Sequence, residues 1–334
     1  MPGPASGSRH DAPPAGTPGR GSERLPVGRR PRAIALVLLA GAGLLVAFLL
    51  RRPPPPVEGL GGGLAFVSDR DGRDALYWRR LPRDRERRLT HLGEPVREPA
   101  VSPDGTRVAF AMGGRLGVVA VATGEVRMLT LGVDWKDAMP AWRPGGRGFV
   151  VAARRASGES LGLHLLDVEA DGSVARHPLT TARGLDDTSP AVSPDGGAVV
   201  FVREAHLWRV ELADGRAVRI TRGFRKSRGP RFLPSGRLVC LWSEGKQHGI
   251  DVLDADGGNR ETLWQGSVHY RTIAPSPDGR HFAATFTYDL AFHLGDTLKL
   301  RQTEEVRLLD ARGRPLGPLE RSIRFANHSP DWGR

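Results

Sequence analysis

The chain has 334 residues and carries 49 Lys and Arg against 37 Asp and Glu, a formal net charge of +12. Of the basic residues 45 are Arg, and they are scattered along the chain, whereas a nucleic-acid-binding protein gathers its cations on one face or helix. This pattern, with abundant Ala, Gly and Pro, is typical of a high-GC genome and excludes a nucleic-acid partner from our expectations. Cys240 is the single cysteine and lies in an apolar run, so we expect a buried side chain and no disulfide.

The first 50 residues divide into two zones. Residues 1–32 are rich in Pro, Gly, Ser and Arg, a composition that predicts disorder. Residues 33–50 contain no polar side chain, and as a helix they would span about 27 Å, close to the thickness of a bilayer core. Arg51 and Arg52 follow where a cleavage site needs small residues, so we expect an uncleaved transmembrane helix; a cleaved signal peptide is the alternative.

The charges around this segment predict its orientation. Five Arg lie in the stretch from Arg20 to Arg32, against three from Arg51 to Arg70, and the more basic flank stays in the cytoplasm. Residues 51–63 are rich in Pro and Gly and read as a linker. We therefore expect a single-pass protein of the bacterial inner membrane with a cytoplasmic N-terminus and its folded domain in the periplasm.

The remaining chain, residues 64–334, contains six copies of one short sequence motif. Ser-Pro-Asp-Gly occurs at 102–105, 193–196 and 276–279, and weaker versions occur at 143–146, 233–236 and 329–332. Each reads as a tight turn after a short inner strand, because Pro presets the first turn dihedral and Gly supplies a positive φ. The turn prolines are 40 to 53 residues apart, and several repeats close on Leu-Thr or Ile-Thr, as at 89–90, 129–130, 179–180 and 220–221. Four strands in a repeat of this length predict an all-β, six-bladed β-propeller of four-stranded blades.

The two ends of this region predict how the ring closes. Residues 64–67 read as a second strand with no inner strand before it, and residues 325–332 read as an inner strand and turn with no second strand after it. Joined, they complete one blade and remove a free sheet edge. The other five blades are then expected at 91–130, 131–180, 181–221, 222–264 and 265–319.

The Ser-Pro-Asp-Gly turns, the Leu-Thr endings, the 68–72 loop and the Asp-rich turn at 254–259 together resemble the WD-like repeats of TolB-type six-bladed propellers, over about residues 64–334. The resemblance implies a periplasmic, non-enzymatic adaptor that binds an envelope protein or peptide. The chain departs from the family pattern before the propeller, where TolB-type proteins carry a cleaved signal and an α/β domain. A glycan ligand, a glycan-directed lyase or hydrolase, and a ligand-sensing domain remain alternatives.

Three sequence features resemble catalytic or metal-binding motifs. Residues 158–162 match G-x-S-x-G, but the repeat places them in a hairpin, whereas a nucleophile elbow needs a strand, a turn and a helix. Residues 69–74 begin like a calcium loop, yet they lack the distal Glu and include Arg70 and Arg73. The histidines show no paired spacing for zinc, and no phosphate-binding loop is evident. We expect no catalytic residue, metal or cofactor.

The loops that enter the inner strands form the predicted binding face, because strand alternation brings them to one end of the ring. Aromatic and Arg residues dominate protein interfaces. The candidate partner-binding residues are Arg97, Asp134, Trp135, Lys136, Asp187, Arg225, Lys226, Tyr270 and Arg271. We expect Trp135 to be an exposed anchor. Residues 285–298, with Tyr288, Phe292 and His293, extend a hairpin well beyond the repeat average, and long segments of this kind tend to be functional or mobile; a cap on the central channel is one role open to it.

Overall fold

The computed structural model describes residues 60–82, 84–158, 160–181, 184–294, 297–318 and 327–333. The predicted tail, the predicted transmembrane helix over 33–50 and linker residues 51–59 lie outside these described residues. Within the described ranges, no helix is both long and apolar enough to cross a membrane. The described residues, from Leu60 onward, form the domain that carries the repeats.

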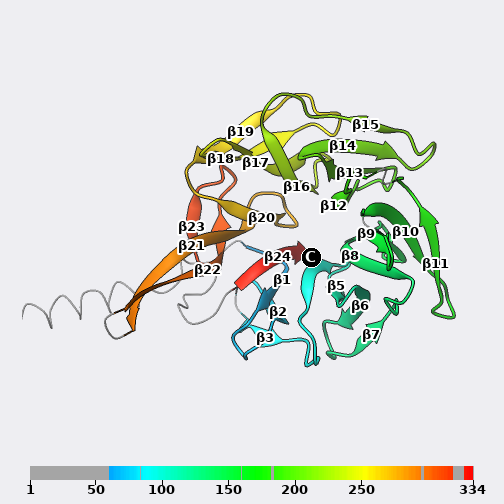
Figure 1. The fold of residues 1–334 in the computed structure, drawn as a ribbon, viewed down its shortest axis with the longest axis horizontal. Helices are drawn as coiled ribbons and strands as arrows, with labels where there is room; N and C mark the ends of the chain where they lie inside the picture. Colours follow the sequence, from blue (N-terminus) through cyan, green and yellow to red (C-terminus); the bar gives the residue numbers. More distant parts are fainter. Residues whose placement is uncertain are drawn as a thin grey trace, which may run out of the picture. The chain divides into compact units, whose positions relative to one another are not determined.

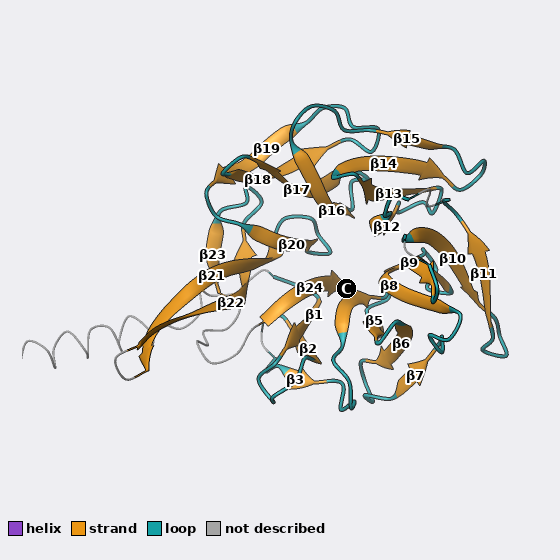
Figure 2. Ribbon diagram, in the orientation of Figure 1, coloured by secondary structure: helices purple, strands orange, loops and turns teal. Residues whose placement is uncertain are grey.

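Six four-stranded antiparallel sheets surround a common centre (Figures 1 and 2). Blade one joins β24 (Asn327–Gly333) to β1 (Gly63–Ser68), β2 (Ala75–Arg80) and β3 (Arg87–Arg88). Blade two contains β4 (Arg97–Val101), β5 (Arg107–Met112), β6 (Arg115–Ala120) and β7 (Val126–Met128), and blade three contains β8 (Trp135–Trp142), β9 (Gly148–Arg155), β10 (Gly162–Val168) and β11 (Val174–Pro178).

Blade four contains β12 (Thr188–Val192), β13 (Ala198–Arg203), β14 (His206–Glu211) and β15 (Ala217–Arg219). Blade five contains β16 (Lys226–Phe232), β17 (Leu238–Glu244), β18 (Gln247–Leu253) and β19 (Glu261–Gly266), and blade six contains β20 (Tyr270–Pro275), β21 (Phe282–Leu294), β22 (Thr297–Leu309) and β23 (Pro315–Pro318). The predicted all-β, six-bladed propeller is confirmed. Among the predicted blade boundaries, the end of blade five differs, because β19 runs past residue 264.

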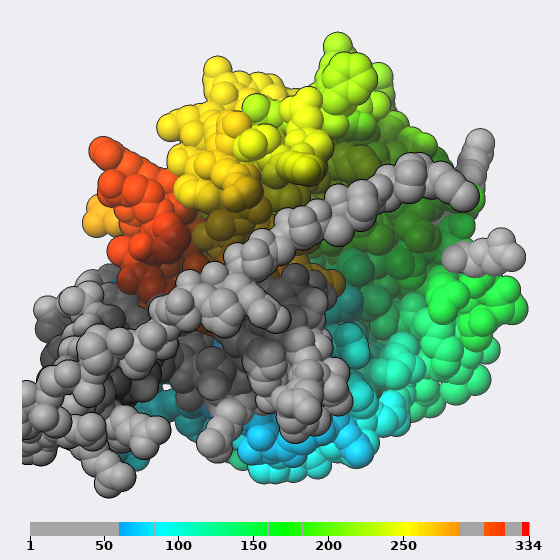
Figure 3. Space-filling model, turned by 60° about the vertical axis from the view of Figure 1, so that its left-hand side comes forward, coloured from blue at the N-terminus to red at the C-terminus, as the bar shows by residue number. Residues whose placement is uncertain are grey.

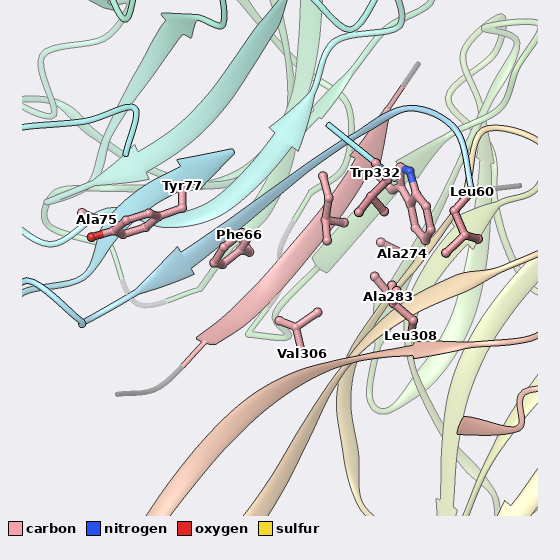
Figure 4. Packing of buried hydrophobic residues seen from close by; sticks show 11 residues of the cluster. Leu60, Phe66, Ala75, Tyr77, Ala274, Ala283, Val306, Leu308 and Trp332 are labelled. Atoms are coloured by element: carbon pink, nitrogen blue, oxygen red, sulfur yellow. The ribbon is translucent and has the colours of Figure 1, made fainter. Parts of the chain in front are cut away.

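The ring closes through blade one, as predicted. The last strand, β24, pairs antiparallel with β1, and Leu64 lies opposite Trp332. The Trp332 indole donates a hydrogen bond to the Gly61 carbonyl over 3.0 Å. Its ring belongs to a buried cluster with Leu60 and with Leu308 of blade six (Figure 4). This pairing gives β1 a partner on its channel side, so that edge is not left open.

Each interface between blades is a layer of apolar side chains. Ile250 and Val252 of blade five pack in one buried cluster with Ile273, Phe282 and Leu309 of blade six. Figure 3 shows the surface of this contact, where yellow atoms of blade five lie against red-orange atoms of blade six. Cys240 is fully buried as predicted, and burial raises the pKa of its thiol to about 12.

The predicted turn at the last repeat is wrong. The segment from Ser329 to Trp332 was predicted to be a turn, but it lies inside strand β24. Pro330 corresponds to a proline four residues before the turn proline in other blades, at positions 99, 140, 190 and 230. The residue before this channel proline has a positive φ in all five cases: Glu98 (55°), Met139 (50°), Ser189 (53°), Gly229 (56°) and Ser329 (50°).

This left-handed residue marks a bulge in the inner strand. In blade two, for example, the pairing with β5 shifts register between Arg97 and Ala100. A bulge inserts unpaired backbone and bends the strand that carries it. Side chains with a positive φ are uncommon outside glycine, and the conformation costs free energy that the surrounding sheet must offset. The inner strands are therefore bent where they line the channel.

The Ser-Pro-Asp-Gly motif forms a turn that is held by local hydrogen bonds. The Ser102 hydroxyl donates to the Asp104 carboxylate and accepts from the Arg107 amide over 2.9 Å. Asp104 also accepts from the Thr106 amide over 3.0 Å, and Gly105 has a φ of 71°. The bonds from Ser102 and Thr106 lower the pKa of Asp104 to about 2. The same contacts recur at 193–198 and 276–281, so this motif specifies a turn.

The threonine that ends a repeat has an equally specific task. The side-chain oxygens of Thr90, Thr130, Thr180 and Thr221 accept hydrogen bonds of 2.8–2.9 Å from the backbone amides of Leu76, Leu116, Leu163 and Leu207, respectively. Each leucine lies near the start of the third strand of its blade. The threonine thus ties the end of the fourth strand back to the third strand before the chain leaves for the next blade.

Replacing Thr221 by Val should lower the free energy of unfolding by about 1–3 kcal/mol, because the buried Leu207 amide loses its acceptor while the side-chain shape is kept. Thermal unfolding of the purified protein measures this effect. Thr123→Val is the matched control, because Thr123 is exposed and should change stability by less than about 0.5 kcal/mol. Equal melting of the two variants would contradict a structural role for the repeat-ending threonine.

Candidate functional site

A cavity of about 450 Å³ lies at the centre of the ring. The first or inner strands of the blades converge there, as Figure 1 shows for β8, β12, β16, β20 and β24. Its lining comes from all six blades and combines proline rings and other apolar groups with charged groups. The residues are Arg97, Glu98, Pro99, Met139, Pro140, Ser189, Pro190, Arg228, Gly229, Arg231, Arg271, Thr272, Ile273, Thr285, Glu304, Ser329 and Pro330.

The repeat places equivalent residues around this channel. One position of the repeat lies two residues before the channel proline, or two residues before Ile273 in blade six. In blades two to six this position holds Arg97, Ala138, Thr188, Arg228 and Arg271, respectively. Blades two, five and six thus contribute arginines, whereas blades three and four contribute small neutral residues. The cations of the channel mouth are therefore concentrated on one arc of the ring.

Most arginines around the cavity have a carboxylate partner. The Arg271 guanidinium lies 2.5 Å from Glu304, that of Arg97 lies 3.6 Å from Asp74, and that of Arg231 lies 3.8 Å from Asp331. Arg228 differs. Its Nε is buried and has no hydrogen-bond partner in the part of the chain that the structure describes. Burial and the nearby Arg271 lower the pKa of Arg228, so the surroundings do not compensate its charge.

The two glutamates that line the cavity each hold a hydrogen bond. Glu98 accepts from the Met139 amide over 2.6 Å, and burial raises the pKa of its carboxyl group. Glu304 accepts from Arg271. The cavity can therefore hold a polar or anionic group at Arg228, while its own acids are occupied by neighbouring donors.

The predicted binding residues divide into three groups. Arg97 and Arg271 come together on the cavity wall. Asp134 and Lys226 are exposed at the starts of β8 and β16. The remaining five are partly or fully buried, and each has a packing or hydrogen-bonding role within the domain.

Trp135 is not the exposed anchor that we expected. Its ring lies edge-on to His164 with the centroids 4.4 Å apart, and the Arg155 and Arg176 guanidinium groups lie 4.9 and 5.0 Å from its centroid. These contacts half-bury the indole within blade three. Lys136, also half-buried, donates to the Gly132 carbonyl over 2.5 Å.

Asp187 and Tyr270 are buried, so a partner on the surface cannot reach them. Asp187 accepts two hydrogen bonds from Arg203, of 2.6 and 2.7 Å, and one from the Thr180 hydroxyl. Tyr270 packs against Trp264 and Phe286 at the interface of blades five and six. A charged or aromatic residue in an entering loop is therefore not necessarily a surface group, because these two side chains anchor their loops to the blades.

Arg225 has a similar internal role. Its guanidinium lies 4.0 Å from the centroid of the Trp242 ring and 3.6 Å from both Glu244 and Asp251. Stacking of this kind favours a fixed side chain. Arg225 therefore holds the loop before β16 against blade five.

Sequence reasoning missed the exposed apolar residues of the same loops. Leu131 and Val133 are 79% and 69% exposed before β8, Leu185 is 38% exposed before β12, and Phe224 is 92% exposed before β16. Each lies between a repeat-ending threonine and the next inner strand. That interval alone does not predict exposure, because Val96 lies in the same interval of blade two and is 1% exposed.

The motifs on catalysis and metal binding have structural explanations. Residues 158–162, of which Glu159 lies outside the described residues, connect β9 to β10, so the predicted hairpin is confirmed. Asp71 in the 69–74 loop accepts hydrogen bonds from Tyr77 and Arg88. No group of three or more His, Cys, Asp or Glu residues is arranged to hold a metal ion in the ranges that the structure describes.

The long hairpin does not cap the channel. Strands β21 and β22 pair continuously from Phe282 with Leu309 to Leu294 with Thr297. Figures 1 and 2 show that this hairpin projects outward from the ring. The side chains of residues 288–303, including Tyr288, Phe292 and His293, lie outside the described residues.

Comparison with known proteins identifies the fold more closely. No family model matches the chain. A TolB homolog of Chlorobium luteolum is 32% identical over 144 residues, which make up 42% of this chain and 31% of that protein. The crystal structure of TolB from Acinetobacter baumannii superposes with a TM-score of 0.64 at 17% identity, over 93% of this chain and 74% of that one. The domain is a TolB-like β-propeller.

The TolB-like chain spans about a third of the length of the curated TolB homologue that it matches. An oligogalacturonate lyase, whose structure is a complex with manganese, has a TM-score of 0.54 at 16% identity, over 76% of this chain and 73% of that one. At this identity the likeness concerns the fold alone, and propellers of one fold serve different functions.

Asp187→Ala tests whether this predicted contact residue is structural. Removing the carboxylate leaves Arg203 without its buried partner, so we expect a loss of about 3 kcal/mol in the free energy of unfolding. Thermal unfolding measures the change. Asp134→Ala is the control, because the exposed Asp134 side chain should contribute less than about 0.5 kcal/mol. A stable Asp187→Ala protein would contradict this assignment.

Proposed function

We propose that this protein is a non-enzymatic, membrane-anchored propeller of the bacterial periplasm that acts as a protein-interaction scaffold or adaptor in the cell envelope. One observation carries the proposal. Exposed apolar side chains occupy the entering loops of three successive blades, at the end of the ring where these loops lead into the channel-lining strands. The TolB-like fold and the TolB relatives support the assignment.

The distribution of these side chains distinguishes them from ordinary surface residues. Among the described residues, six large hydrophobic side chains are exposed, and four of them are Leu131, Val133, Leu185 and Phe224. Single exposed apolar residues are normal, but a group on one face of a domain marks an interaction surface. Phe224 is followed by Arg225 and Lys226, and such a mixture of aromatic and basic groups suits a polypeptide partner.

An enzyme acting on a glycan is the alternative, because a lyase shares the fold. General acid–base catalysis needs a group placed to exchange a proton with the substrate. The two cavity glutamates already accept hydrogen bonds from Met139 and Arg271, which favours the scaffold. A glycan remains an alternative ligand of the loop face.

Phe224 gives a direct test of the binding face. A photo-crosslinking residue at position 224, in cells of the native bacterium, should form an adduct with an envelope protein. Phe224→Ser should then weaken binding of that protein by about 2 kcal/mol or more, as loss of an interface anchor does. Leu316→Ser is the control, because Leu316 is an exposed apolar residue of the outer strand β23. Equal binding by both variants would contradict the proposal.

The proposed anchor has a separate test. Full-length protein should sediment with membranes and resist carbonate extraction, because residues 33–50 supply an apolar segment long enough to cross the bilayer. A reporter joined after Arg334 should be active only if it works in the periplasm. Recovery of a soluble form that begins near residue 51 would show a cleaved signal peptide instead.

A further inference from the structure

We propose that the central channel is a binding site for a small organic monocarboxylate, whose carboxylate group pairs with Arg228. This site is independent of the proposed protein-binding face. Its basis is the pairing of charges around the cavity, the space beside Arg228 and the chemistry of the cavity wall.

Arg228 is the arginine of the cavity wall that lacks a carboxylate partner among the described residues. Arg97, Arg231 and Arg271 each have a carboxylate within 4 Å, whereas the buried Nε of Arg228 has no hydrogen-bond partner and the Arg228 guanidinium has no carboxylate partner among the residues that the structure describes. Arg228 is half-buried. A partly desolvated cation without a counter-charge is unfavourable, and an anion that pairs with it recovers that cost. Nearby His248 and His269 add no charge at neutral pH, because burial, followed by the charge of Arg228, lowers the pKa of each.

Arg228 borders open space in the cavity wall. Blade five has Gly229 where other blades carry Glu98, Met139 or Ser189, both Arg228 and Gly229 line the cavity, and a Cβ atom at Gly229 would meet no atom within 4 Å beyond its chain neighbours. The cavity of about 450 Å³ falls within the range of small-molecule sites. The proline rings, Met139 and Ile273 offer an apolar wall for the body of a ligand.

The charges favour a monoanion. A guanidinium presents parallel donors that match the two oxygens of a carboxylate. Only the charge of Arg228 is unpaired among the lining arginines that the structure describes, so the cavity offers a ligand one positive charge. A carboxylate therefore fits better than a phosphate dianion.

Calorimetric titration of the full-length protein in detergent tests the site with simple probes. Hexanoate should bind saturably, while its neutral isostere hexanamide and inorganic phosphate should bind at least about tenfold more weakly, because each loses the charge match to Arg228. The tripeptide acetyl-Ala-Pro-Ala, with a free or an amidated carboxyl end, tests the other source of a carboxylate. Binding of the free-acid peptide without binding of hexanoate would overturn the small-molecule assignment.

Substitutions locate the site. Arg228→Met should weaken hexanoate binding by about tenfold or more, and Arg228→Lys, which keeps the charge without the planar fork, should be intermediate. Arg280→Met is the control, because Arg280 is exposed in the turn between β20 and β21. Without ligand, Arg228→Met should melt no lower than the unchanged protein, since it removes an unpaired cation. Unaltered hexanoate binding in Arg228→Met would overturn the proposal.

The channel site and the loop face can be separated by one further variant. Phe224→Ser should leave hexanoate binding unchanged, because Phe224 does not line the cavity. Loss of partner binding in Phe224→Ser with normal hexanoate titration would support both proposals. Loss of hexanoate binding in Phe224→Ser would contradict an independent channel site.

Discussion

The pairing of β24 with β1 is the constraint on which the rest of the domain depends. Six blades enclose a channel only if the first and last strands share one sheet, and this contact joins residues about 270 positions apart, such as Leu64 and Trp332. The cavity inherits its geometry from that closure, since Ser329 and Pro330 of β24 form part of its wall. Without this strand the arc between Arg271 and Arg97 would be open.

Closure also determines how the inner strands meet the channel. Each inner strand pairs on one side only, with the second strand of its blade, and its bulge bends the backbone at the cavity. The same position then carries a different side chain in each blade. A symmetric scaffold thereby holds an asymmetric charge distribution, with arginines from blades two, five and six and neutral residues from blades three and four.

The repeat made the fold predictable. Ser102, Asp104 and Thr221 act on atoms a few residues away or in the neighbouring strand, so their spacing reports the local structure faithfully. The Ser-Pro sequence at Ser329 nevertheless gave a wrong prediction of a turn. Ser-Pro occurs both in the turns and at the bulge of an inner strand, and only the pairing of β24 with β1 distinguishes the two cases.

The candidate site was less predictable because its properties depend on contacts between distant residues. Tyr270 and Phe224 are both aromatic residues near the start of an inner strand, yet the first is buried and the second is 92% exposed. Their difference comes from Trp264 and Phe286, which cover Tyr270. The isolation of Arg228 likewise depends on which carboxylates reach its neighbours in three dimensions, and no spacing in the chain records that.

The shared blade has a kinetic consequence. During synthesis, blades two to six can form from segments that are neighbours in the sequence, but β1 gains its inner partner only after β24 has been made. Contacts between such distant segments carry a large loop-closure entropy and form slowly. We therefore expect a long-lived intermediate in which an almost complete arc exposes β1 to other strands, so that chaperones that protect sheet edges matter most until β24 has paired.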